Sequence, residues 1–212
     1  ADILILATPV GVIVDLLKKI GPDLKEGAIV VDLGSTKEVI EKSAKKYLPE
    51  KVYFVGCHPF CGSEKKGVEQ AREDLYQKSI CFITSKNKAT ALISKMWEKI
   101  GSRVVEVSPG AHDQITCLIS HLPHLICFSL LNLVSDNYLK FSSSGFSDLT
   151  RIGSSSGDLW ADIFLTNKEK LLKNINKYNQ EIDKFKEAIK KNNRKKIKAL
   201  IKKANQKRSQ II

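Results

Sequence analysis

One short segment of the sequence gathers side chains suited to proton transfer. Residues 56–67 read Gly-Cys-His-Pro-Phe-Cys-Gly-Ser-Glu-Lys-Lys-Gly and follow directly on the apolar run 52–55. Histidine takes or gives a proton near neutral pH, and Ser63 and Glu64 lie a few residues beyond His58. Structural histidines are also common, so residue type alone leaves both roles open for His58.

The same segment also resembles part of a zinc site. Cys57, His58 and Cys61 form a C-H-x-x-C cluster of residue types that bind zinc. However, the sequence holds no second Cys pair at zinc-finger spacing, so we expect no metal. The cysteine count is odd, at five, and no signal peptide is recognisable. This combination predicts a reduced, cytoplasmic protein.

The elements that must position His58 are apolar runs that alternate with helical patterns. The runs are 2–7, 28–33, 52–55, 80–83 and 104–107, and the helical patterns are 10–20, 36–47 and 88–100. Continuous apolar strands between helices are typical of a mainly parallel sheet covered on both faces, the doubly wound, Rossmann-like α/β class. Ligands of such sheets bind beyond the carboxyl ends of the strands, where Thr8, Ser35 and His58 all fall. Ser35 or Thr36 is the expected N-cap of the second helix.

After Ser108-Pro109-Gly110 no further strand is indicated. We expect an all-α part with helices at about 111–135 and 157–212, and a division into domains 1–109 and 110–212. The apolar stretch 115–134 is interrupted by polar residues, so it is interpreted as buried helix and not as a membrane span. The Ser-rich segment 141–146 is interpreted as a loop lining a site.

The net charge of +12 lies entirely in the last helical region. Residues 168–212 hold 16 Lys/Arg and 4 Asp/Glu, whereas residues 1–167 hold 19 of each. A basic tail can bind nucleic acid, but no aromatic residue interleaves the lysines after Phe185 and no nucleic-acid motif is recognisable. A solvated helical face explains the charge, and we expect neither a nucleic-acid nor a membrane partner.

A seam of apolar residues runs through the same region with an average step of about 3.5 residues, as in a coiled coil. Its members are Leu171, Ile175, Tyr178, Ile182, Phe185 and Ile189. Such a seam packs against another long helix, either within the chain or from a second subunit. We therefore expect a homodimer built by residues 111–212.

Six segments, in the same order, resemble the prephenate/arogenate dehydrogenase family of tyrosine biosynthesis. The strongest, 56–67, is similar to the family's G-x-H-P-[MI]-[AF]-G-[ST]-E-K-x-G block. The others are 7–10 (ATPV), 32–37 (DLGSTK), 120–124 (SHLPH), 145–152 (GFSDLTRI) and 160–164 (WADIF). The resemblance extends over essentially the whole chain.

The resemblance implies oxidative decarboxylation of prephenate to 4-hydroxyphenylpyruvate, with hydride transfer to NAD or NADP. It also implies site residues. His58 matches the histidine that accepts the proton of the ring hydroxyl, Ser35 the serine that contacts that histidine and the nicotinamide, and Arg151 the arginine that binds the ring carboxylate. Further matches are the substrate-pocket residues His121, His124, Ser63 and Glu64 and the cofactor-contacting turn Thr8-Pro9.

Two departures from the family pattern leave alternatives open. The G-x-G-x-x-G turn and the acidic residue that follows it are absent from the sequence, so we expect the front of the nucleotide-binding domain to be missing and NAD to bind poorly to this chain. Ser147 stands where some members carry a basic residue, which leaves prephenate and arogenate both possible as substrate.

Two other functions compete with this interpretation. A 3-hydroxy acid dehydrogenase of similar architecture would use a lysine on a helix of the second domain, but no Lys lies between Arg103 and Lys140. A non-catalytic helical interaction module with a basic surface is the alternative from a different class.

Overall fold

The computed structural model describes residues 1–61 and 71–211. The segment 62–70, which includes the predicted site residues Ser63 and Glu64, and the last residue lie outside the described part. The chain forms two compact units, a main unit of residues 1–170 and a C-terminal helical unit of residues 171–212.

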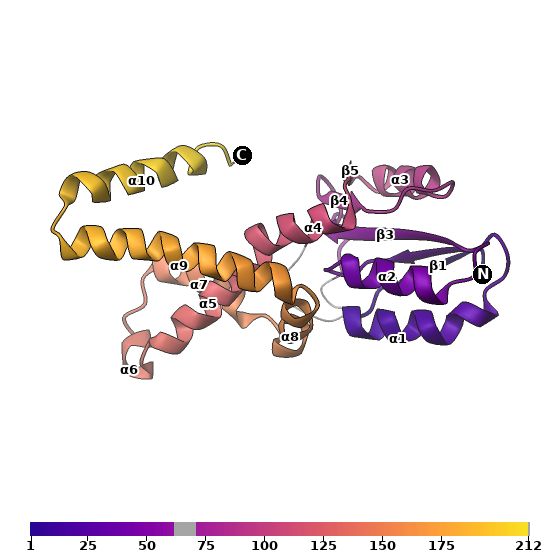
Figure 1. Ribbon diagram of the computed structural model, residues 1–212, viewed down its shortest axis with the longest axis horizontal. Coiled ribbons are helices and arrows are strands. Elements are labelled where there is room, and N and C mark those ends of the chain that lie inside the picture. The colour runs from indigo at the N-terminus through magenta and orange to yellow at the C-terminus, as the bar shows by residue number, and fades with distance from the viewer. Residues whose placement is uncertain (62–70, 212) are drawn as a thin grey trace. The chain divides into compact units, whose positions relative to one another are not determined.

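A five-stranded sheet forms the first half of the main unit (Figure 1). Its strands lie in chain order and are β1 (Ile3–Leu6), β2 (Ile29–Asp32), β3 (Tyr53–Phe60), β4 (Ile80–Ile83) and β5 (Arg103–Glu106). The first three are parallel, β4 runs antiparallel to β3, and β5 is parallel to β4. The mainly parallel α/β sheet predicted from the apolar runs is confirmed.

Helices cover both faces of the sheet. Successive residues of a strand point to opposite sides, so a continuous apolar strand must be covered on both. Helices α1 (Val10–Ile20) and α2 (Glu38–Tyr47) share one apolar cluster with Val30, whereas α3 (Thr90–Lys99) shares the other with Val31. Both valines are fully buried. Each therefore stabilises the fold by roughly 1.5–3 kcal/mol relative to an exposed side chain.

Strand β3 is longer than the sequence predicts. The apolar run indicates an end near residue 55, at Gly56, yet the strand continues to Phe60, and His58 lies within it instead of after it. The reason is β4, whose residues Ile80–Ile83 pair with Cys57–Phe60 and supply partners for the extension. His58 is therefore held in a paired strand, opposite Phe82.

The second half of the main unit is helical. Its elements are α4 (Pro109–Thr116), a π-helical turn (Cys117–His121), α5 (Leu122–Leu133), α6 (Asp136–Leu139), α7 (Ser144–Thr150), a 3₁₀ turn (Arg151–Ser154) and α8 (Gly157–Thr166). The interpretation of 141–146 as a site-lining loop is wrong, since its last residues begin α7 and none lines the cavity described below. The continuous helical stretch Pro109–Leu133 is long and apolar enough to cross a membrane by length and composition, a property that core helices of soluble proteins share.

Two aspartates of the helical half bind the N-termini of two of the sheet helices, α1 and α2. The carboxylate of Asp113 on α4 accepts the backbone N–H groups of Lys37 (2.7 Å) and Glu38 (3.0 Å) at the start of α2. Asp162 on α8 accepts the N–H of Gly11 in α1 at 3.0 Å. The expected side-chain cap from Ser35 or Thr36 is absent, because a tertiary contact supplies it. A carboxylate at a helix N-terminus is favoured by the helix dipole.

The C-terminal unit consists of most of α9 (Lys168–Lys190) and of α10 (Arg194–Arg208) (Figure 1). Asn192 adopts a left-handed conformation (φ 47°) between them, and the side chain of Asn193 caps α10 by accepting the N–H of Lys196. In the predicted seam, Ile182 is 46% and Ile189 62% exposed in the single chain.

Candidate active site

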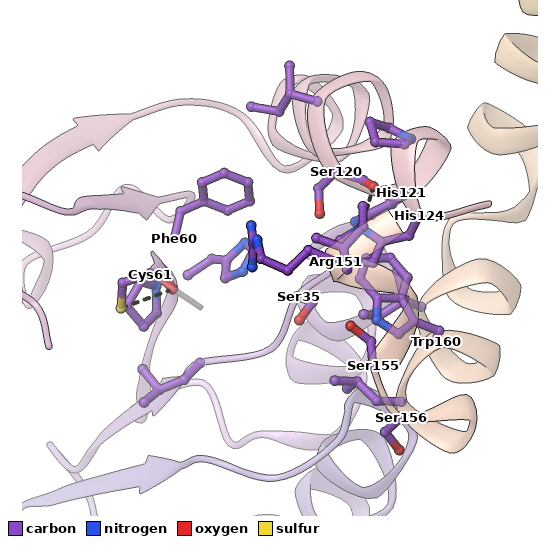
Figure 2. A pocket seen from close by; sticks show the side chains of 18 residues that line it. Ser35, Phe60, Cys61, Ser120, His121, His124, Arg151, Ser155, Ser156 and Trp160 are labelled. Carbon is purple, nitrogen blue, oxygen red and sulfur yellow. Dashed lines mark hydrogen bonds between the residues drawn. The ribbon is translucent and has the colours of Figure 1, made fainter. Parts of the chain in front are cut away.

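A cavity of about 530 Å³ lies in the main unit, between the carboxyl ends of the strands and the helical half (Figure 2). Five predicted site residues line it together, namely Ser35, His58, His121, His124 and Arg151. Thr8 and Pro9 are exposed in the turn after β1 and are not part of the lining. The positions of Ser63 and Glu64 lie outside the described residues.

The parallel strands explain how the first of these residues reach the cavity. Strand β2 ends at Asp32, and the loop that follows carries Ser35 to the cavity wall. Gly34 makes this course possible, since a Cβ atom there would lie only 2.6 Å from Cδ1 of Ile40. A larger residue at this position would require the Ile40 side chain to shift.

Helix geometry places the histidines of the other wall. Ser120 and His121 belong to the π-helical turn between α4 and α5, a local distortion often found at functional sites. One turn later, His124 stacks on Trp160 of α8 with ring centroids 3.6 Å apart, and its Nδ1–H donates to the Ser120 carbonyl at 2.9 Å. The imidazole of His124 is thereby fixed in orientation.

His58 has a hydrogen-bond partner that sequence reasoning missed. Its Nδ1 lies 2.8 Å from Nε2 of His112, and Nδ1 of His112 lies 2.7 Å from Oδ1 of Asp113. His112 and Asp113 are almost completely buried. Burial, followed by the neighbouring His112 and Lys37, lowers the pKa of His58 well below its usual range. His58 is consequently neutral at physiological pH, and one of its ring nitrogens carries a lone pair.

Lys37 is a second residue to which the sequence assigned no role. Its side chain is completely buried, forms an ion pair with the carboxylate of Asp32, and donates to the carbonyl of Cys57 at 2.6 Å. The ammonium thus ties the loop after β2 to the strand residue before His58. The sequence signal that could have identified this ion pair is a lysine five residues after an aspartate that ends a buried strand.

The tautomer of His121 follows from Asn167. The Asn167 side-chain amide nitrogen donates to the backbone carbonyl of Asp113 at 2.8 Å and lies 3.1 Å from Nδ1 of His121. Because the amide nitrogen can only donate, Nδ1 of His121 accepts and its Nε2 carries the hydrogen. Burial lowers the pKa of His121 to about 4, so the ring is a neutral hydrogen-bond donor.

The zinc-like cluster does not converge on one point. Cys57 packs in the apolar cluster beneath α3 together with Cys81, whereas the neighbouring His58 lines the cavity on the other side of the strand. Among residues 1–61 and 71–211, no group of three or more His, Cys, Asp or Glu side chains could hold a metal ion.

The cavity favours an anionic ligand. In the described part of its wall the ionisable side chains are Arg151, three histidines and Cys61, with no Asp or Glu. The apolar remainder includes Phe60, Leu159 and Trp160. A planar, partly apolar ring bearing carboxylates matches these walls.

Comparison with known families assigns both halves of the chain. Residues 1–106 match the nucleotide-binding domain of prephenate dehydrogenase, and residues 108–203 match its dimerization domain. The chain belongs to the prephenate dehydrogenase family. The Rossmann-like sheet and the helical half described above are the two parts of that family's fold.

Individual members of the prephenate dehydrogenase family are similar over most of the chain. Prephenate dehydrogenase of Bacillus subtilis is 35% identical over 196 residues, 87% of this chain and 53% of that protein. Cyclohexadienyl dehydrogenase of Zymomonas mobilis is 32% identical over 200 residues, 89% of this chain and 68% of that protein. The chain thus spans about half the length of the B. subtilis and Lactococcus lactis relatives.

Solved structures of family members superpose closely. Prephenate dehydrogenase from A. aeolicus, crystallised with hydroxyphenyl propionate and NAD+, has a TM-score of 0.90 and 32% identity, covering all of this chain and 77% of that one. Synechocystis arogenate dehydrogenase has a TM-score of 0.84 and 27% identity, covering all of this chain and 80% of that one.

The described residues fit one end of a dinucleotide. The carboxyl end of β1 presents the exposed Thr8-Pro9 turn, and the loop after β2 presents the half-buried Ser35 at the cavity wall. Doubly wound sheets bind ligands beyond these strand ends. No Gly-rich phosphate loop occurs in the printed sequence.

Proposed function

We propose that this chain is the core of an enzyme that oxidatively decarboxylates prephenate to 4-hydroxyphenylpyruvate in tyrosine biosynthesis, with NAD, or alternatively NADP, as oxidant. The observation that carries the proposal is the convergence of Ser35, His58, His121, His124 and Arg151 on one cavity from segments far apart in the sequence. The similarity to the A. aeolicus enzyme, which binds a ring compound together with NAD+, supports it.

Prephenate has a hydroxyl group at one end of a cyclohexadiene ring and a carboxylate at the other. In the proposed reaction His58 accepts the hydroxyl proton, while loss of carbon dioxide makes the ring aromatic. When bound, NAD supplies the acceptor for the hydride that leaves the hydroxyl-bearing carbon. Burial beside His112 and Lys37 keeps His58 neutral, so one of its ring nitrogens carries the lone pair that a base requires.

The remaining roles concern binding and orientation. We propose that Arg151 binds the ring carboxylate of the substrate, since its planar fork suits a carboxylate. Nε2–H of His121 is proposed to donate a hydrogen bond to the substrate and so to orient it. His124, Ser63 and Glu64 complete the proposed substrate pocket. Thr8, Pro9 and Ser35 are proposed to contact the cofactor, and Ser35 also to contact His58.

Arogenate remains the alternative substrate. A cyclohexadienyl dehydrogenase and an arogenate dehydrogenase among the similar proteins support this alternative. Prephenate carries two carboxylates and no ammonium group, which matches a described wall that holds Arg151 but no acidic residue. The ratio of kcat/KM for the two substrates decides between them. A ratio in favour of arogenate would overturn the preference.

We further propose a homodimer in the cytoplasm. The match of residues 108–203 to a dimerization domain and the partly exposed apolar seam of α9 support the dimer. All five cysteines are free thiols in the structure, which fits a reducing compartment.

The test is turnover by a full-length enzyme that contains this chain. With prephenate and NAD, NADH absorbance and 4-hydroxyphenylpyruvate should rise together. The variant His58→Asn should lower kcat by roughly 10²–10⁴-fold, the usual effect of losing a general base, while cofactor binding stays within a few-fold. Wild-type turnover by His58→Asn would remove His58 from the chemistry.

A further inference from the structure

Three side chains form a hydrogen-bonded line that leads away from the cavity. His58 lines the cavity, His112 lies behind it, and Asp113 lies behind His112, with 2.8 Å and 2.7 Å between the bonded atoms. His112 and Asp113 do not line the cavity and are almost completely buried. The line thus joins the proposed base to a carboxylate that substrate cannot reach.

The hydrogen atoms of this line can be assigned from its far end. Asp113 accepts the backbone N–H groups of Lys37 and Glu38. Burial alone would raise the pKa of Asp113, but the hydrogen bonds from His112 and from these N–H groups hold it below its usual value. Asp113 is therefore an ionised acceptor, and Nδ1 of His112 must carry the hydrogen that it shares with Asp113.

The assignment then passes along the line to His58. A neutral His112 with hydrogen on Nδ1 has a lone pair on Nε2, so the bond to His58 requires hydrogen on Nδ1 of His58. Nε2 of His58 is left as the atom with a lone pair. This is the opposite tautomer to that of His121, in which Asn167 forces the hydrogen onto Nε2.

We propose that His112 and Asp113 are positioning residues for His58, which fix its Nε2 lone pair for the substrate proton and take over the positive charge that results. The proposal rests on the function proposed above. Asp113 plays the part of a triad carboxylate, with one additional histidine between it and the base. Its second bond, to the N-terminus of α2, anchors it in the fold.

The proton balance is simple. The substrate O–H bond breaks, and a new N–H bond forms at Nε2 of His58. The hydrogen on Nδ1 of His58 then moves to Nε2 of His112, so His58 is neutral again and His112 becomes an imidazolium. When carbon dioxide leaves and the ring becomes aromatic, the proton returns along the same line to the ring oxygen, which forms the hydroxyl of the product and leaves both histidines neutral. The cation on His112 lies 2.7 Å from the Asp113 carboxylate, whereas on His58 it would have no direct carboxylate partner among the described residues. A buried charge is far less costly when it is paired.

The first test measures tautomers in the 212-residue chain, without any activity assay. The chain is labelled with ¹⁵N-histidine, and each ring is assigned by loss of its signals in single His→Gln variants. His58 and His112 should both show hydrogen on Nδ1, and His121 should show it on Nε2. Hydrogen on Nε2 of neutral His58 overturns the proposal, even if the enzyme is active on prephenate.

The second test compares two substitutions of His112 in a full-length enzyme. His112→Gln retains a carbonyl that can accept from Nδ1 of His58 but cannot take a proton, whereas His112→Phe can do neither. We expect kcat to fall about 10-fold for Gln and roughly 10²–10⁴-fold for Phe, with KM within about threefold for both. Equal loss in the two variants, or a rise in KM that accompanies unfolding, indicates a purely structural role and overturns the proposal.

The third test separates the two roles of Asp113, its contact with His112 and its contact with the N-terminus of α2. Asp113→Asn and Asp162→Asn each remove a carboxylate from the N-terminus of a sheet helix, but only Asp113 contacts His112 among these two. Both variants should lose similar thermal stability. Only Asp113→Asn should lower kcat, by on the order of 10²–10⁴-fold, as expected when a base is held in the wrong tautomer. Equal kcat in the two variants contradicts the proposal. If the parent enzyme shows no turnover of prephenate at all, the proposed function fails while the tautomer test still stands.

Discussion

Arg151 is the proposed anchor for the ring carboxylate, and it follows α7 at the cavity wall. Arg151→Ala should raise KM for prephenate by on the order of 30–1,000-fold, equivalent to about 2–4 kcal/mol of charge-assisted binding, with a smaller change in kcat. Steady-state kinetics measure both constants.

Two control variants sharpen this test. Arg151→Lys keeps the charge but loses the planar fork, and should recover only part of the loss. Arg103→Ala removes an exposed arginine of β5 and should leave KM unchanged. An unchanged KM in Arg151→Ala would place the ring carboxylate elsewhere.

The buried His121 links stability to pH. Its pKa is about 4 in the folded protein, below the value of about 6.5 expected when unfolded. Above pH 6.5 both states are neutral, so His121 adds no pH dependence. As the pH falls below 6.5, only the unfolded state gains the proton, and stability is lost by about 2 kcal/mol between pH 8 and pH 5.

The variant His121→Gln isolates this effect. His58 and His112 also have lowered pKa values and contribute a slope of the same sign in both proteins. Urea denaturation of the two proteins at pH 8 and pH 5 should therefore show a smaller loss of stability for His121→Gln than for the unmodified chain. Equal losses would mean that His121 is protonated in the folded state.

At the scale of helices and strands, local patterns predicted most of the sheet. The apolar runs and helical spacings locate β1, β2, α1 and α3 within about two residues, because burial against the sheet imposes the pattern directly. The end of β3 was missed because pairing with β4 decides it. A local sequence pattern does not contain the partner of a strand.

Local sequence patterns also decide which site residues were predicted and which were missed. His58 and Arg151 lie in distinctive motifs, and resemblance identified them. His112-Asp113 is a plain dipeptide in a helix, and its importance arises only from the approach of α4 to β3 and α2. The N-cap of α2 was misassigned because its acceptor lies 75 residues or more away in sequence.

Close packing of two helix ends gives a prediction for Gly21. A Cβ atom at this position would lie 2.3 Å from the carbonyl oxygen of Tyr47, which is backbone and cannot rotate away. Gly21→Ala should therefore separate the ends of α1 and α2 and destabilise the chain by about 1–3 kcal/mol. Urea denaturation measures the free energy of unfolding.

Gly145 provides the matched control. It lies in α7 with nothing within 4 Å of the added Cβ, so Gly145→Ala should be neutral or stabilising by up to about 1 kcal/mol, since alanine favours helix. Similar stabilities for the two variants would show that the contact between Gly21 and Tyr47 relaxes without cost.

At the scale of the whole molecule, the chain divides at one place by compactness and at another by family matches. Compactness separates residues 1–170 from 171–212, because Asp113 and Asp162 bind the helical half to the sheet helices. Family matches divide the chain near residue 107. The boundary at 109/110 that the sequence predicts stays a prediction, close to the point where the two family matches meet, and residues from both sides of it line the cavity.

The seam of α9 gives the last prediction, which concerns assembly. Ile182 is 46% exposed in the single chain, a position that a second subunit would cover in the proposed homodimer. Ile182→Asp would place an unpaired charge in that interface, at a cost of several kcal/mol. Ile201→Asp is the matched control, since Ile201 is 47% exposed on α10 and lies outside the seam. Sedimentation at micromolar concentration should show a dimer for the parent chain and for Ile201→Asp, and a monomer for Ile182→Asp. A monomeric parent chain would contradict the dimer, and a dimeric Ile182→Asp would move the interface away from the seam.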